Sequence, residues 1–314
     1  MMRLAVIDLG TNTFHLLIVD LEGEDFSVVY REKTAVRIGK DGISEGFITD
    51  EARQRAIKAL KRFREVIDIH EAEEVSATAT SAIRNAKNGE ELVAEILKTT
   101  GISVRIIDGL QEASYIYNGV KKALNIGSHP TLVMDIGGGS IEFIIGNQEK
   151  IFWKHSYEIG GQRLIDRFHA SDPISKTEQK ELLAYLKQEL SSLRAIAVKY
   201  DVKTLIGSSG TFDTLSDIYC VKNGLEKDLS ATEYPLDFEQ FRTIVDEVIS
   251  KTRAERLEIP GMIEMRVDMI VVAVILVQFV VEYLGITNMR VSSYALKEGV
   301  LLNAIEQIRS KSMK

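Results

Sequence analysis

This chain of 314 residues has little cysteine, no excess of positive charge and no hydrophobic run long enough to cross a membrane. Its one cysteine, Cys220, excludes an internal disulfide and fits a reducing compartment. With 46 acidic and 39 basic residues, the formal charge is −7. This balance argues against non-specific binding of nucleic acid and against an anionic membrane surface as a partner. It still allows a polyphosphate-like substrate, because local cations or a metal ion would be enough to bind one.

The hydrophobic segments indicate a folded core rather than a membrane anchor or a leader. The most apolar stretch, Met269 to Val281, is shorter than the roughly 18 residues of a membrane helix, so it predicts a buried helix. The opening sequence MMRLAVIDLG has an acidic residue at position 8 and no small-residue cleavage site, which favours a core strand over a signal peptide. We therefore expect a cytoplasmic protein, of a length that suits two domains.

Two segments with the same strand–turn–strand pattern organise the sequence. In residues 131–146, TLVMDIGGGSIEFIIG, a short apolar run ends at Asp135 and is followed by three glycines and a second apolar run. In residues 4–19, LAVIDLGTNTFHLLIV, Asp8 likewise ends an apolar run. Aligning the two aspartates superposes three further pairs: Gly10 on Gly137, Thr13 on Ser140 and His15 on Glu142. The repetition predicts two related halves.

Each of these turns combines a carboxylate with glycine backbone. The N–H groups of a glycine-rich turn can face an anion. A carboxylate beside them would repel phosphate unless a hard cation such as Mg²⁺ lay between the two. The pattern therefore indicates a metal–phosphate site. The alternative reading is a tight hairpin in which the aspartate is only structural.

Strands alternate with helices along the rest of the chain, which predicts an α/β fold in two similar halves. The loop at Gly127–Pro130 separates domains 1–126 and 127–314, and the last helix could return to pack on the first domain. Among the local elements, the patterns predict strands at 26–30 and 34–38, a helix capped by Thr49, a capping box of Asn88 with Glu91, and helices over 177–200 and 262–284.

Five segments in order are similar to the exopolyphosphatase / guanosine pentaphosphate phosphohydrolase family: VIDLGTNTFHLLI, SATATSAIRNAKN, IIDGLQEASYIYNGV, LVMDIGGGSIEFI and LIGSSGT. The resemblance covers about Ala5 to Val300 and is to the short, two-domain form. It implies two similar domains of the actin-like ATPase (ribonuclease H-like) type, with an interdomain cleft. It also implies Mg²⁺ or a similar divalent cation, and release of terminal orthophosphate from polyphosphate or guanosine pentaphosphate.

The resemblance implies roles for individual residues. Glu112 matches the glutamate that positions and deprotonates the attacking water, and Arg84 matches an arginine that would face phosphate oxygens. Asp135 matches a catalytic and metal-site position. The implied metal set is Asp8, Asp135 and Glu142. The implied phosphate-binding positions are Asn12, Thr13, Gly137, Gly138, Gly139, Ser140, Gly210 and Thr211, with Arg266 and Lys297 as further candidates.

Three positions depart from the pattern of the family. His15 and Lys297 stand where arginine is common, and Gln111 stands where a second acidic residue is frequent. The first two replace a bidentate, always-charged group by a titratable or point-charge group, which weakens the expectation for long polyanions. The alternatives that remain open are an ATP-dependent small-molecule kinase and a non-catalytic nucleotide sensor. A homodimer is an expectation that rests on the resemblance alone.

Overall fold

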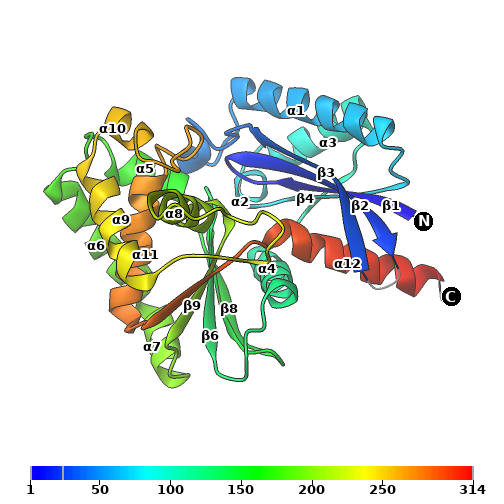
Figure 1. Ribbon diagram of the computed structural model, residues 1–314. Helices are drawn as coiled ribbons and strands as arrows, with labels where there is room; N and C mark the ends of the chain where they lie inside the picture. The colour runs from blue at the N-terminus through cyan, green and yellow to red at the C-terminus, as the bar shows by residue number, and fades with distance from the viewer. Residues whose placement is uncertain (1, 23–24, 313–314) are drawn as a thin grey trace. The chain divides into compact units, whose positions relative to one another are not determined.

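The computed structural model describes residues 2–22 and 25–312 (Figure 1). The chain divides into two compact units. Unit 1 contains the chain up to Gly119, the three glycines 137–139 and the chain from Leu296 onward; unit 2 contains residues 120–136 and 140–295. The division falls inside helix α4 (Gly109–Ala123), a few residues before position 126, and the last helix, α12 (Leu296–Ser312), groups with unit 1.

Unit 1 is built on a five-stranded sheet in the order β3-β2-β1-β4-β5. Its strands are β1 (Met2–Leu9), β2 (Thr13–Glu22), β3 (Asp25–Ala35), β4 (Glu74–Ala79) and β5 (Val104–Ile106). Strands β1, β2 and β3 form an antiparallel meander, and β4 and β5 continue the sheet in parallel. Its other elements are a 3₁₀ turn at Ile43–Glu45 and the helices α1 (Asp50–Ile69), α2 (Ser81–Arg84) and α3 (Gly89–Thr100).

Unit 2 is built on a six-stranded sheet in the order β10-β11-β9-β6-β7-β8. Its strands are β6 (Thr131–Ile136), β7 (Ile141–Gly146), β8 (Ile151–Tyr157), β9 (Thr204–Ser208), β10 (Glu233–Tyr234) and β11 (Asn288–Ser292). Its helices are α5 (Gly161–Phe168), α6 (Lys176–Glu189), α7 (Ser191–Lys199), α8 (Ser209–Lys222), α9 (Phe238–Ser250), α10 (Arg253–Leu257) and α11 (Ile270–Leu284). Both β6 and β7 are buried along their whole length, as continuous apolar runs predict.

The two sheets repeat one topology. The order β3-β2-β1-β4-β5 corresponds to β8-β7-β6-β9-β11, with the same antiparallel and parallel pairings. The register of the first hairpin also repeats, because Asp8 lies opposite His15 and Asp135 lies opposite Glu142. The predicted fold class, α/β with two similar domains of the actin-like ATPase type, is confirmed.

Several local predictions need correction. The strand expected at 26–30 and the first two residues of the one expected at 34–38 belong to the single strand β3, whereas residues 36–38 lie outside any strand. A bulge at Ile18/Val19 adjusts the register of the ladder between β3 and β2. The helix expected over 177–200 is two helices, because the fully buried Leu190 leaves the helical conformation between them. The helix expected from position 262 begins only at Ile270, after a run of turns.

The two predicted helix caps had different outcomes. Thr49 caps α1 as expected, because its side chain accepts a hydrogen bond from the N–H of Ala52. Asn88 precedes α3 but forms no capping bond. Its amide instead pairs with the backbone of Ile48, accepting from the N–H at 3.0 Å and donating to the carbonyl at 2.8 Å. The buried side chain thus satisfies a distant loop rather than its own helix.

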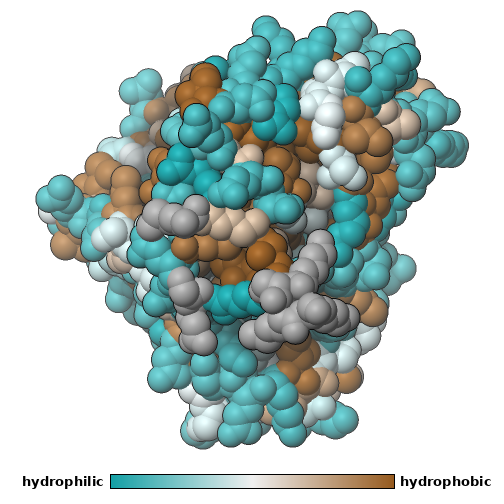
Figure 2. Space-filling model, turned by 90° about the vertical axis from the view of Figure 1, so that its right-hand side faces the viewer, coloured by the Kyte–Doolittle hydropathy of each residue, from teal (hydrophilic) through white to brown (hydrophobic). Residues whose placement is uncertain are grey.

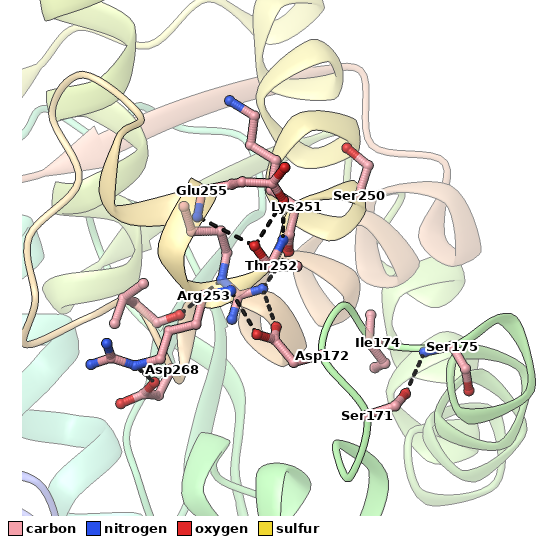
Figure 3. A network of polar contacts seen from close by, with 12 residues as sticks. Ser171, Asp172, Ile174, Ser175, Ser250, Lys251, Thr252, Arg253, Glu255 and Asp268 are labelled. Atoms are coloured by element: carbon pink, nitrogen blue, oxygen red, sulfur yellow. Dashed lines mark hydrogen bonds and ion pairs between the residues drawn. The ribbon is translucent and has the colours of Figure 1, made fainter.

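A polar network ties the loop between α5 and α6 to α10 (Figure 3). Asp172 accepts hydrogen bonds from the N–H of Arg253 at 2.7 Å and from Nη1 of Arg256 at 3.0 Å. In the first turn of α6, Glu178 accepts from the N–H of Ser175 at 2.7 Å and completes a capping box for that helix. The fully buried guanidinium of Arg256 is therefore paired with a carboxylate, as a buried charge requires.

No helix within the described residues is long and apolar enough to span a membrane. The most apolar one, α11, has 15 residues and packs in the core of unit 2. On the face of the molecule in Figure 2, hydrophilic side chains cover most of the surface and hydrophobic ones form separate patches. The predicted role of the stretch 269–281 as a buried helix is therefore confirmed from Ile270 onward.

Candidate functional site

In unit 1, the first turn of α4 presents the predicted catalytic carboxylate. The strand β5 ends just before this helix, and Asp108 caps it by accepting a hydrogen bond from the N–H of Gln111 at 2.8 Å. Glu112 follows in the first turn, where its charge is favourable for the helix dipole, yet its side chain is buried. Burying a carboxylate costs free energy unless a partner pairs with it, and the helix terminus alone does not offset that cost.

That partner is Arg84, the last residue of α2. Its Nη1 atom lies 2.8 Å from Oε2 of Glu112 and also donates to the carbonyl of Ile107 at 3.1 Å. The sequence predicted both residues as catalytic but gave no reason to expect them in contact. A charge-assisted hydrogen bond of this kind keeps the carboxylate ionised and fixes its orientation. Arg84 therefore fixes the position of the Glu112 carboxylate.

The glycine turn 137–139 groups with the loop after β1 and the start of α2. A Cβ on Gly139 would lie 2.4 Å from Oγ of Ser81 and 2.8 Å from Oγ1 of Thr11. A Cβ on Gly138 would lie 3.0 Å from Nδ2 of Asn12. Only glycine fits this close approach, and the surrounding atoms are hydroxyl and amide groups. Hydroxyl, amide and backbone N–H groups in such a turn suit the oxygens of a phosphate. Thr13 is the first residue of β2, and its backbone carbonyl closes the loop after β1 by accepting from the N–H of Gly10 at 3.1 Å.

In unit 2, two carboxylates face each other across a hairpin. Asp135 on β6 and Glu142 on β7 are opposite residues of an antiparallel pair, so their side chains share one face. Hydroxyl donors surround both of them. Ser208 and Ser209 donate to the same oxygen of Asp135, Oδ2, at 2.8 and 2.6 Å. Ser156 on β8 donates to Oε1 of Glu142 at 2.6 Å. The sequence interpretation of residues 207–211 was a ligand-facing loop, but it did not predict that Ser208 and Ser209 bind Asp135, and it gave no role to Ser156.

The start of α8 brings a buried cation against a glycine. The guanidinium of Arg266 packs so closely over Gly210 that a Cβ there would lie 1.7 Å from Nη2. Burial lowers the pKa of Arg266, and the negative charges of Asp213 and Asp135 oppose that shift. Within the part of the chain that the structure describes, Oγ1 of the buried Thr211 has no hydrogen-bond partner. A cation, a helix N-terminus and a hydroxyl together favour an anion.

The carboxylates of the two hairpins meet only part of the coordination that a divalent cation needs. Within residues 2–22 and 25–312, no three side chains of His, Cys, Asp or Glu converge as a metal-binding group. The assignment of Asp8, Asp135 and Glu142 as the metal set therefore remains a prediction. Two facing carboxylates still fit Mg²⁺, which takes one or two carboxylates and fills its other positions with water and phosphate oxygens. Asp8 ends β1 in unit 1, opposite His15 rather than a second carboxylate.

Three other residues that the sequence singled out are Ser140, Lys297 and Gln111. Ser140 immediately precedes β7, and its side chain is buried. Lys297 pairs with its neighbour Glu298 at 2.8 Å at the start of α12. Gln111 donates to the hydroxyl of Tyr115 at 3.0 Å within α4. The last two contacts are local, and they give no evidence of a role in binding phosphate.

The chain is similar to known proteins over nearly its whole length. Residues 17–308 match the sequence pattern of the Ppx/GppA phosphatase family. Exopolyphosphatase 2 of Mycobacterium tuberculosis is 29% identical, over 96% of this chain and 98% of its own. A solved exopolyphosphatase from Cytophaga hutchinsonii is 45% identical, with a TM-score of 0.94 over 97% of this chain and 98% of its own. A Ppx/GppA family member from Aquifex aeolicus is 27% identical, with a TM-score of 0.80 over 98% of both chains.

Proposed function

The chain belongs to the Ppx/GppA phosphatase family, as its five motifs predicted, and from that premise we propose that it is an exopolyphosphatase. It would release terminal orthophosphate from inorganic polyphosphate. The names of the relatives in Mycobacterium tuberculosis and Cytophaga hutchinsonii support this substrate. The observation that carries the chemistry is the buried ion pair of Glu112 with Arg84, because it holds one carboxylate ionised and in a fixed orientation.

In the proposed reaction, Glu112 accepts a hydrogen bond from a water molecule and orients it toward the terminal phosphorus. The water oxygen forms the new P–O bond, the bridging P–O bond breaks, and the water proton passes to the carboxylate. The products are orthophosphate and a polyphosphate shorter by one unit. Phosphoryl transfer to water depends mainly on positioning and on neutralising charge, so one oriented carboxylate is sufficient on the side of the nucleophile.

The phosphate oxygens would be bound by backbone and small polar groups. In unit 1 these are the glycine turn 137–139 with Asn12 and Thr13, and in unit 2 they are Gly210, Thr211 and the guanidinium of Arg266. Asp135 with Glu142 would hold a Mg²⁺ ion, which when bound would neutralise charge on the phosphate oxygens, and Asp8 stays a predicted further ligand. The hydroxyl donors on Asp135 and Glu142 support this assignment because they hold the two carboxylates side by side.

Guanosine pentaphosphate is the second substrate of the proposal, because it ends in the same phosphoanhydride. A kinase would need a base beside an acceptor hydroxyl, and a sensor would bind nucleotide without turnover. The predicted homodimer and cytoplasmic location remain predictions.

The test is phosphate release by purified protein with Mg²⁺ and, in separate reactions, long polyphosphate, guanosine pentaphosphate, or ATP with sugars. Glu112→Gln keeps a hydrogen-bond acceptor for Arg84 but removes the base, and we expect turnover to fall about 10²–10⁴-fold. Glu90→Gln is the matched control, since Glu90 is an exposed acidic residue in the first turn of α3. Wild-type protein that releases no phosphate from polyphosphate, or Glu112→Gln protein with near-normal turnover, would contradict the proposal.

A further inference from the structure

A residue with an unfavourable backbone conformation begins α8 in unit 2. Ser209 has a φ of +68°, in the left-handed region that residues with a Cβ rarely occupy. Glycine is the residue usually found in that conformation, because it has no Cβ to clash with the backbone. Gly207 and Gly210 stand on either side of this residue, yet neither has a positive φ. The serine at 209 therefore suggests that its side chain is used.

The two neighbouring glycines meet a different need, which is space. A Cβ on Gly207 would lie 2.0 Å from Cδ1 of Phe212, and a Cβ on Gly210 would lie 1.7 Å from Nη2 of Arg266. Packing thus explains glycine at both positions without reference to φ. Ser209, whose positive φ would suit glycine, is therefore the residue of this turn that carries a side chain despite its backbone conformation.

The hydroxyl of Ser209 donates to Oδ2 of Asp135 at 2.6 Å. Ser208 donates to the same oxygen at 2.8 Å, and this bond follows from the strand register, which places Ser208 beside Asp135. Ser209 is the next residue along the chain, and in a continuing strand its side chain would point to the other face. The left-handed backbone turns it to the same side. Two donors on one oxygen fix the rotation of the carboxylate group about its last bond.

We propose that Ser209 is a positioning residue, whose strained backbone aims its hydroxyl at Asp135 and holds that carboxylate in one orientation for a divalent cation. This inference rests on the proposed function, in which Asp135 is a ligand of Mg²⁺. Groups that hydrogen-bond to a metal ligand orient it, and removing one typically lowers metal affinity about 10–100-fold. The strain is maintained because the rest of the turn, through Gly207 and Gly210, is fixed by packing.

The experiment compares Ser209→Ala with Ser209→Gly. Both lack the hydroxyl, but only alanine keeps a Cβ on the left-handed backbone. Isothermal titration calorimetry with Mg²⁺ alone measures affinity without substrate, and urea unfolding measures stability. We expect both variants to bind Mg²⁺ about 10-fold more weakly than the wild type. We also expect a higher urea midpoint for Ser209→Gly than for Ser209→Ala, because glycine relieves the strain.

Three results would overturn the inference: wild-type Mg²⁺ affinity in both variants, wild-type affinity in Ser209→Gly alone, or a wild-type protein that binds no Mg²⁺. The second would show that residue 209 matters only through its backbone. Ser208→Ala serves for comparison, because it removes the other bond to Oδ2 without touching the strained residue, and it should also weaken Mg²⁺ binding. A wild-type protein that releases no phosphate from polyphosphate would contradict the proposed function. The Mg²⁺ affinities measured by calorimetry would still decide the role of Ser209.

Discussion

Removing both members of the pair formed by Arg84 and Glu112 should destabilise the protein by clearly less than the sum of the two single removals. Nη1 of Arg84 and Oε2 of Glu112 are 2.8 Å apart, and the side chains are 14% and 7% exposed. With an effective dielectric constant of about 20, their attraction is about 6 kcal/mol. Most of this offsets the hydration that the two charges lose on burial. A single deletion leaves the other charge buried without its partner, which typically costs about 3–5 kcal/mol.

Arg84→Met and Glu112→Met should therefore each lower the free energy of unfolding by about 3 kcal/mol. The double variant should lose clearly less than the sum, with a coupling energy of at least about 2 kcal/mol. Phosphate release should be nearly lost in all three proteins, since recovered stability does not restore the oriented carboxylate. Urea unfolding followed by circular dichroism, with phosphate release measured on the same preparations, provides both quantities.

The reasoning is refuted by a coupling energy below about 0.5 kcal/mol, the range found for independent sites. It is also refuted by a double variant that hydrolyses polyphosphate at the wild-type rate, because catalysis would then not pass through this pair. A low coupling energy with lost activity would separate the two claims: the pair would matter for the reaction but not for the fold.

Two further predictions concern unit 2. Hydrogen bonds from the hydroxyls of Ser171 and Ser175 and from the N–H of Ser175 hold the pKa of Glu178 far below its usual range. The stabilisation is therefore present above the ordinary carboxylate pKa and is lost as pH falls below about 4.5. Glu178→Gln should destabilise the protein by about 1 kcal/mol at pH 7 and by less at pH 3, as measured by urea unfolding at both pH values. Gly210→Ala should displace the guanidinium of Arg266, because the added Cβ would lie 1.7 Å from Nη2. We expect a higher KM for polyphosphate and a loss of about 1–3 kcal/mol of stability; an unchanged KM would remove Arg266 from substrate binding.

The parts of the fold that the sequence predicts are those that local patterns determine. An apolar run that ends at an aspartate followed by glycine marks each first hairpin, and both predicted strand–turn–strand units form, with Asp8 opposite His15 and Asp135 opposite Glu142. The break between α6 and α7 was not predictable in the same way, because the pattern is helical on both sides of Leu190. It arises where that side chain is buried by the rest of unit 2.

Contacts between distant segments explain the rest of what the sequence did not show. Helix α12 groups with unit 1 because Gly299 packs directly on the backbone of Tyr115, where a Cβ would lie 1.8 Å from the carbonyl oxygen. The pairing of Arg84 with Glu112 joins residues 28 positions apart. Each residue could be recognised by its motif, but only the packing of α2 against the loop before α4 brings them together. The bonds from Ser208 and Ser209 to Asp135 were missed because they depend on the parallel pairing of β9 with β6 and, for Ser209, on its positive φ.

Among the positions at which the two hairpins differ, the one opposite the aspartate bears on the proposed division of chemistry. Each unit ends its central strand with an aspartate, but unit 1 places His15 opposite it and unit 2 places Glu142. Facing carboxylates repel each other unless donors or a cation separate them, so the hairpin of unit 2 favours a metal ion. A histidine opposite an aspartate has no such need. Unit 1 instead carries its buried charge pair on α2 and α4, after the hairpin, where Glu112 is oriented by Arg84. The two hairpins thus share one pattern, and the difference at this position is consistent with the proposed roles, a cation in unit 2 and an oriented nucleophile in unit 1.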